Sequence, residues 1–85
     1  MIKSLEETIE LMQSEDFKER FKAEYWQTRI RYNNLLDMLV KLDAGTLNFE
    51  PKCSKDLLRH QANVMGQYLY DLAVRAQIEG VDLDI

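Results

Sequence analysis

Hydrophobic residues recur along this chain in two long stripes separated by one short loop. The first stripe, with alternating steps of four and three residues, consists of Phe21, Tyr25, Thr28, Tyr32, Leu35, Leu39 and Leu42. The second, with alternating steps of three and four, consists of Leu58, Gln61, Met65, Tyr68, Leu72 and Arg75. This spacing is typical of helices that pack along their length. Because the loop between the stripes is short, the pattern predicts an all-α fold, a long antiparallel helical hairpin.

Capping residues set the expected ends of the helices. Ser4 with Glu7 fits a capping box, Ser14 and Ser54 are good N-caps, and glycines follow both long helices as expected C-caps. The first helix is too short to be stable alone, so we expect it to dock on the hairpin. The predicted single helical domain, residues 1–85, has a short helix at 5–13, a long helix at 15–44, a loop at 45–53, a second long helix at 54–79 and a tail at 80–85.

Polar residues stand at stripe positions that a purely structural hairpin would fill with Leu or Ala. They are Thr28, Gln61 and Arg75, and a charge in a seam is costly unless it is paired or near the surface. In an antiparallel hairpin Arg75 would lie near Glu24 and could form an ion pair with it. Alternatively, Arg75 residues from several subunits converge on an anion. Both alternatives predict that replacing Arg75 is harmful, through stability in the first and through ligand binding in the second.

Composition favours self-association. The chain has 85 residues, and 46% of them are apolar, which is more than a two-helix hairpin can bury by itself. Gly66 lies inside the second long helix, where glycine costs about 1 kcal/mol relative to alanine. A close helix crossing in an oligomer, or a ligand lying against the bare backbone, would offset that cost. We expect a homo-oligomer, either a dimer or a tetramer.

The charge balance narrows the classes of partner. The formal net charge is −4, from 11 basic and 15 acidic residues, which argues against binding to duplex nucleic acid because such binding usually shows as a basic stripe. We expect no membrane partner, since no apolar run of about 18 residues is present, and the sequence shows no secretory signal with a small-residue cleavage site. A lone cysteine, Cys53, suits a reducing compartment. The predicted location is cytoplasmic.

Motifs for catalysis or metal binding are missing from the sequence. His60 is the only histidine and Cys53 the only cysteine, and no HExxH, GxSxG, CxxC or Walker pattern occurs. Glu6, Glu7 and Glu10 have no partner histidine and are typical of a solvated first helical turn. We therefore expect a protein that is not an enzyme and has neither a metal site nor a cofactor.

Aromatic and cationic residues indicate a binding surface instead. Several stand three, four or seven positions apart, which places them on neighbouring surfaces of a helix. Such groups can stack a base and hold a phosphate by forked guanidinium hydrogen bonds. The alternative is that the tyrosines belong to the core and the charges to a solvated face. The candidate ligand-binding residues are Tyr25, Arg29, Tyr32, Gln61, Tyr68 and Arg75.

Several segments resemble one family of small helical-hairpin proteins. They are Glu24-Tyr25, the block of Leu35, Met38 and Leu39, the loop Ala44-Gly45-Thr46-Leu47-Asn48-Phe49-Glu50-Pro51, and Leu57-Leu58-x-x-Gln61-x-x-x-Met65-Gly66-x-Tyr68-Leu69-x-x-Leu72-x-x-Arg75. This pattern, over residues 16–83, is similar to phage and prophage proteins described as related to a crAss-like phage protein. The resemblance implies a small accessory protein of phage origin, in a family that includes sponges for the cyclic nucleotide signals of bacterial immunity such as CBASS or Thoeris.

The resemblance and the residue pattern together lead to one functional hypothesis. They predict a phage anti-defence protein that sequesters a cyclic nucleotide immune signal without cleaving it. The ligand, a cyclic di- or oligonucleotide, would bind at the interfaces of the homo-oligomer in the host bacterial cytosol. The alternative is a protein-protein interaction module that inhibits a host defence protein or serves phage regulation or assembly, with Trp26, Phe49 and the helix at 5–13 as anchors.

Overall fold

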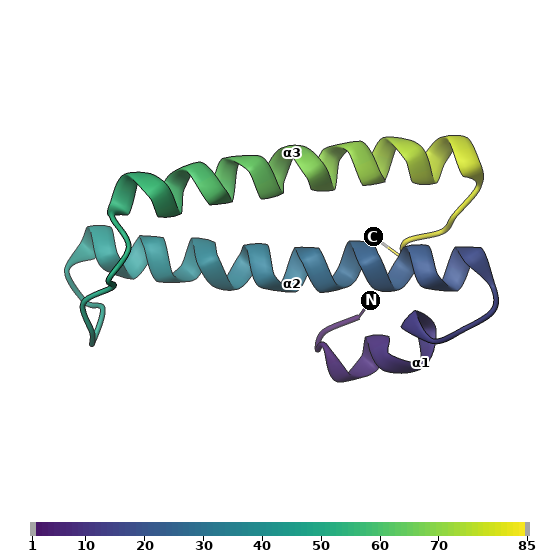
Figure 1. Ribbon diagram of the computed structural model, residues 1–85, viewed down its shortest axis with the longest axis horizontal. Coiled ribbons are helices and arrows are strands. Elements are labelled where there is room, and N and C mark those ends of the chain that lie inside the picture. Colours follow the sequence, from purple (N-terminus) through teal and green to yellow (C-terminus); the bar gives the residue numbers. More distant parts are fainter. Residues whose placement is uncertain (1, 85) are drawn as a thin grey trace.

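The computed structural model describes residues 2–84, and its regular elements are all helical, with no strand among these residues (Figure 1). The elements are η1 (Glu6–Thr8), α1 (Ile9–Met12), α2 (Phe17–Ala44) and α3 (Lys55–Glu79). Helices α2 and α3 run side by side in opposite directions, and α1 lies against another side of α2 (Figure 1). The predicted antiparallel hairpin with a short N-terminal helix is confirmed. No helix within residues 2–84 is long and apolar enough to cross a bilayer.

The stripe predicted on α2 forms the side of that helix that packs in the core. Phe21, Tyr25 and Leu39 are buried, and the other stripe residues are half-buried. The core is concentrated where α2 begins and α3 ends. Its buried cluster consists of Phe21, Tyr25, Trp26, Leu69, Leu72, Ala76, Val81 and Leu83.

The packed side of α3 agrees with the predicted stripe at Leu72, which is buried, and at Leu58 and Met65, which are half-buried, but differs from it elsewhere. Gln61, Tyr68 and Arg75 are exposed, so their predicted place in the core seam is wrong. The residues buried in their stead follow one position later along the helix, about 100° around its axis, and two of them are alanines. Because alanine is small, it lets two helices approach closely, but it does not mark a seam as clearly as a large apolar residue does. The buried residues of α3 are Ala62, Leu69, Leu72 and Ala76.

Most of the caps predicted for the two long helices are confirmed. Gly45 and Gly80 end α2 and α3 in the left-handed conformation, with φ of 78° and 71°. The Ser54 hydroxyl accepts a hydrogen bond from the backbone N–H of Leu57, 3.1 Å away, at the start of α3. These caps fix where the loop begins and ends.

The predicted caps at Ser14 and Ser4 are wrong. The N-cap of α2 is Asp16, whose carboxylate accepts a hydrogen bond from the second residue of the helix. The Ser14 hydroxyl instead accepts one from the Asp16 backbone N–H. The N-cap of η1 is Leu5, with no side-chain capping bond, and the carboxylate of Glu7 accepts a hydrogen bond from the backbone N–H of Lys3 rather than of Ser4.

The N-terminal segment docks on α2 through a buried polar contact. Thr8 is fully buried, and its hydroxyl accepts a hydrogen bond from the Gln27 side-chain amide of α2, 2.8 Å away. The same hydroxyl donates to the Leu5 carbonyl. The expectation that the short helix needs a docking surface is therefore confirmed.

The C-terminal segment is part of the core, which the sequence pattern did not indicate. Val81 and Leu83 are 5% and 6% exposed, and the Val81 backbone N–H donates to the Ala76 carbonyl. After Gly80 turns the chain, this segment returns along the hairpin toward α2 (Figure 1).

Candidate ligand-binding site

The structure does not bring the candidate residues together within one chain. Tyr32 lines a surface hollow with Tyr70, whereas Tyr68 is two residues from Tyr70 and therefore points about 200° away around α3. Gln61 and Arg75 are each seven residues from Tyr68 and follow its direction. We call the edge of the hairpin that holds Gln61, Tyr68 and Arg75 the Tyr68 edge. The edge that holds the hollow is the Tyr32 edge.

Tyr25 belongs to neither edge. Its side chain is 5% exposed, and its ring meets the Trp26 ring edge-on, with centroids 5.2 Å apart and planes at 90°. This geometry is the favoured arrangement of two packed aromatic rings. Tyr25 is a core residue of the chain, and its contact with a ligand stays a prediction.

Arg29 and Tyr32 lie together on the Tyr32 edge. The Arg29 Cζ is 5.8 Å from the centroid of the Tyr32 ring, within the range in which a ring face attracts a cation. Both side chains are half-buried. The hollow beside them is open to solvent and is lined by Tyr32, Asn63, Gly66, Gln67, Tyr70 and Asp71.

Gly66 has an explanation within the chain. A Cβ atom at this position would lie 3.2 Å from the Tyr32 hydroxyl oxygen and 3.5 Å from two ring carbons. The missing side chain therefore makes room for the Tyr32 ring, which packs against bare helix backbone. Neither an oligomer contact nor a ligand is needed to account for this glycine.

Sequence reasoning missed most of the α3 side of the hollow. Asn63, Gln67 and Tyr70 stand at positions i, i+4 and i+7, so they share one face of α3. Tyr70 is 70% exposed, which is unusual for a large aromatic side chain. The polar i, i+4, i+7 pattern ending in a tyrosine was visible in the sequence, but the seam on α3 had to be placed correctly before that face could be recognised as exposed.

The Tyr68 edge carries a second cation beside an aromatic ring. The Arg75 Cζ lies 4.9 Å from the centroid of the Phe21 ring, and the Arg75 Nε donates to the Glu79 carboxylate, 2.9 Å away. The predicted ion pair with Glu24 is therefore wrong, since the partner is one turn along the same helix. Arg75 is placed over the end of the core, with half of its side chain exposed.

Each edge offers a cation, a tyrosine and amide groups to a ligand. Arg29 can hold a phosphate by charge-assisted hydrogen bonds, the Tyr70 ring can stack on a planar base, and the amides of Asn63 and Gln67 can donate to and accept from its edge. Asp71 adds a negative charge at one side of the hollow. No group of His, Cys, Asp and Glu side chains within residues 2–84 is arranged to hold a metal ion.

The anchors of the alternative hypothesis are placed very differently. Trp26 is 4% exposed, and its indole N–H donates to the Leu83 carbonyl, so it cannot contact a partner protein while the chain is folded. Phe49 in the loop is 56% exposed. The α1 segment is already docked on α2.

The fold defines a small all-α hairpin protein whose two edges carry aromatic and cationic side chains. The sequence model of one family, Sequestin, matches residues 15–78. Since this match covers more than half of the chain, the protein belongs to the Sequestin family. No curated protein matches the sequence. No solved structure matches it either.

Proposed function

We propose that this protein is a sponge, a non-catalytic protein that binds a cyclic nucleotide immune signal and withholds it from its receptor. The observation that carries the proposal is the Tyr32 edge, where two tyrosine rings and two amide side chains line one open hollow and the Arg29 guanidinium lies beside one of these rings. Membership of the Sequestin family supports it, because the family name denotes sequestration.

The chemistry of a cyclic nucleotide fits these groups. A cyclic nucleotide contains both phosphates and bases. A guanidinium binds a phosphate by forked hydrogen bonds, and stacking of each base on an aromatic side chain contributes about 1–3 kcal/mol. Side-chain amides pair well with the hydrogen-bonding edge of a purine. Because Asp71 repels phosphate, the phosphate belongs at the Arg29 end of the hollow and the base at the Tyr70 end.

Self-association is part of the proposal. The candidates other than Tyr25 lie on opposite edges, so a site that uses all of them requires a second copy whose Tyr68 edge meets the Tyr32 edge of the first. Such a head-to-tail arrangement can close into a ring with one equivalent site at every interface. Leu57 and Val64 follow the Tyr68 stripe and are 54% and 49% exposed, so this edge has apolar surface to bury.

The biological setting follows from the same hypothesis. A sponge acts by abundance and affinity and needs no nucleophile, metal or cofactor. A phage protein of this kind would work in the cytosol of the infected bacterium, where CBASS-type enzymes release their cyclic nucleotide. Binding without cleavage would keep the immune effector inactive.

The test is to incubate the purified protein with cyclic dinucleotides, cyclic trinucleotides and cyclic ADP-ribose isomers, remove free ligand by filtration and release bound ligand by heat. Chromatography of the released material should recover one nucleotide intact. A chemically altered product would contradict binding without cleavage. If no ligand is depleted from the panel, the sponge proposal fails.

A matched pair of variants locates the site. Arg29→Ala should lose ligand retention by at least about tenfold, since a hydrogen bond to a charged group contributes about 1.5–3 kcal/mol. Arg31→Ala is the control, because Arg31 is exposed and points about 200° away from Arg29 around α2. Equal losses in the two variants would indicate general charge attraction and would contradict a site on the Tyr32 edge. Sedimentation of both variants checks that assembly is unchanged.

One observation favours the second candidate function, a protein-protein interaction module. Phe49 is a large aromatic side chain that the fold leaves exposed on a loop, and aromatic residues commonly dominate binding energies at interfaces. If the protein inhibits a host defence protein through this loop, Phe49→Ala should abolish inhibition while Arg29→Ala leaves it intact. The opposite result supports the sponge.

A further inference from the structure

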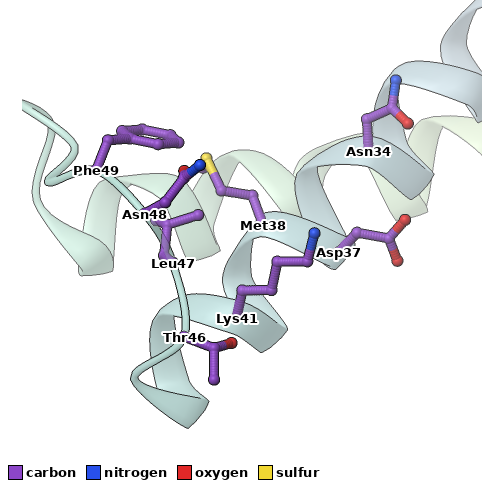
Figure 2. Close-up of a pocket in the computed structure, with 8 residues that line it drawn as sticks. All are labelled: Asn34, Asp37, Met38, Lys41, Thr46, Leu47, Asn48 and Phe49. Carbon is purple, nitrogen blue, oxygen red and sulfur yellow. The ribbon is translucent and has the colours of Figure 1, made fainter.

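The loop between α2 and α3 folds back on α2 and forms a cradle, whose lining residues are distinct from those of the hollow on the Tyr32 edge (Figure 2). The cradle lies at the end of the hairpin where α2 ends and α3 begins (Figure 1). The cradle is lined by Asn34, Asp37, Met38, Lys41, Thr46, Leu47, Asn48 and Phe49.

Backbone geometry at the end of α2 directs the loop onto this face. Gly45 turns the chain in the left-handed conformation, and the Thr46 N–H donates to the Lys41 carbonyl, 2.9 Å away, which is the bond of a Schellman motif. Asn34, Met38 and Lys41 stand at i, i+4 and i+7 on α2, so they share one face beneath the returning loop.

The cradle combines an apolar floor with polar groups on its rim. Met38 and Leu47 are half-buried, and the Phe49 ring stands over them with 56% of its surface exposed. Figure 2 shows Asn48 beside Phe49 on the loop and Asn34, Asp37 and Lys41 along the helix. The structure therefore places a ring, two amides, one carboxylate and one ammonium around a single cavity.

The polar side chains of the cradle are not used elsewhere in the fold. Among residues 2–84, the side chains of Asn34, Asp37, Lys41 and Asn48 form no hydrogen bond or ion pair with another residue. By contrast, Asp43, six residues after Asp37 on the same helix, is paired with both Lys55 and Arg59. The groups at the rim are thus available to a ligand.

Charge and shape narrow the ligand class. The negative charge of Asp37 and the positive charge of Lys41 cancel, so the cavity does not favour a polyanion. The Phe49 ring next to the apolar side chains of Met38 and Leu47 suits a flat ring, and the Asn48 amide beside it can both donate and accept hydrogen bonds with that ring. A carboxylate is the group that dinucleotide-binding proteins use to bind a ribose hydroxyl. These features together describe a nucleobase attached to a ribose.

We propose that the loop cradle binds a purine ribonucleoside monophosphate whose 2′ and 3′ hydroxyls are both free. The base stacks on Phe49, and its edge pairs with the amide of Asn48, which lies beside Phe49 on the loop (Figure 2). The Asp37 carboxylate accepts a hydrogen bond from the ribose diol, and Lys41 holds the phosphate. A cyclic di- or oligonucleotide uses one of the two hydroxyls of each ribose in its linkage, so the cradle would not accept such a ligand in the same way. This inference does not rest on the proposed sponge function.

The test is a titration of the full-length, isotope-labelled protein with AMP, followed by NMR. AMP at millimolar concentration should shift the side-chain amide signals of Asn48 and the backbone signals of residues 46–49. Deoxy-AMP should bind about tenfold more weakly, because a hydrogen bond to a charged group is lost. Ribose 5-phosphate, which has no base, should leave these signals unchanged. Absence of shifts with AMP, or equal shifts with ribose 5-phosphate, overturns the proposal.

Variants distinguish a specific binding site from a loop that binds ligands nonspecifically. Asp37→Asn should remove the preference for AMP over deoxy-AMP, and Phe49→Ala should remove binding of both. Glu50→Gln is the matched control, because Glu50 is an exposed loop carboxylate that does not line the cradle. If Glu50→Gln has the same effect as Asp37→Asn, or if Asp37→Asn keeps the preference, the assignment of the diol to Asp37 is wrong. Far-UV circular dichroism confirms that each variant is folded.

Discussion

The indole Nε1 of Trp26 donates a hydrogen bond to the main-chain carbonyl of Leu83, 2.9 Å away, and both residues are buried. This bond ties the end of the chain to α2. The family match ends at residue 78, so the segment that covers Trp26 lies beyond the matched region. Ile2, at the other end of the chain, packs against the same cluster. Both termini therefore help to close the core around one tryptophan.

We predict that Leu83→Ala destabilises the protein although it lies two residues from the C-terminus. Removing a buried leucine side chain typically costs about 2–5 kcal/mol, and the loosened segment also weakens the bond to Trp26. Urea unfolding followed by Trp26 fluorescence measures the loss. The control is Ile78→Ala, because Ile78 is 78% exposed, and such surface changes usually stay within about 0.5 kcal/mol. Equal midpoints for the two variants would show that the C-terminal segment does not stabilise the core.

Gly66 and Tyr32 should show non-additive effects on stability. Alanine at position 66 gains about 1 kcal/mol of helix propensity, but its Cβ would lie 3.2 Å from the Tyr32 hydroxyl oxygen. The two effects oppose each other, so Gly66→Ala alone should change the free energy of unfolding little. In a Tyr32→Phe background the close oxygen is gone, and Gly66→Ala should stabilise by up to about 1 kcal/mol. A double-mutant cycle measured by thermal unfolding gives the coupling, and a coupling of zero would mean that the two side chains do not compete for the same space.

The hairpin itself was predictable because its signals are local and repeated. The stripe on α2, the left-handed glycines at 45 and 80 and the Ser54 cap all depend on residues a few positions apart. On α3, the positions of Leu72, Leu58 and Met65 were predicted correctly, but every second stripe position was placed one residue too early, because the buried alanines at 62 and 76 are weak markers of a seam. One position is enough to turn Gln61, Tyr68 and Arg75 from core residues into surface residues.

The candidate site was only partly predictable for a related reason. Arg29 and Tyr32 are close in sequence, and the structure keeps them together. Their neighbours Asn63, Gln67 and Tyr70 come from the other helix, so finding them requires the register of α2 against α3. The bond between Trp26 and Leu83 spans 57 positions, and no periodic pattern in a short tail can reveal such a contact.

Acid should weaken the loop end of the hairpin through Asp43. Hydrogen bonds from Arg59 and then from Lys55 hold the pKa of the Asp43 carboxyl below its ordinary value. A carboxyl whose folded-state pKa is lowered contributes stability that is fully present above its unfolded pKa of about 3.9 and is lost as the pH falls through the folded value. We predict that Asp43→Asn removes this part of the pH dependence, so its unfolding midpoint should fall less than that of the wild type between pH 6 and pH 3.

Salt provides the check on this interpretation. Asp43 is exposed, so its attraction to Arg59 and Lys55 is screened at high ionic strength. The wild type and Asp43→Asn should therefore approach each other in thermal stability at about 1 M salt. Glu50→Gln serves as a control, since Glu50 is an exposed carboxylate that forms no ion pair among residues 2–84. If Glu50→Gln alters the acid transition as much as Asp43→Asn does, the effect is one of net charge.

Replacing Arg75 tests whether this residue stabilises the fold or binds the ligand. Its ion pair with Glu79 is half exposed, and such pairs contribute about 0–1 kcal/mol, while its contact with the Phe21 ring adds about 0.5–1 kcal/mol at an exposed site. We predict that Arg75→Ala lowers the free energy of unfolding by no more than about 1–2 kcal/mol and leaves the helical content unchanged. Retention of the cyclic nucleotide, in contrast, should fall by at least about tenfold, because a charge-assisted hydrogen bond is lost.

Glu79→Gln is the control for Arg75→Ala. It breaks the same ion pair without removing the cation, so it should lose a similar or smaller amount of stability and keep the ligand. Unfolding and ligand retention are measured on both variants. If Arg75→Ala unfolds the protein, or if both variants lose the ligand equally, Arg75 acts through the fold and is not a contact for the phosphate.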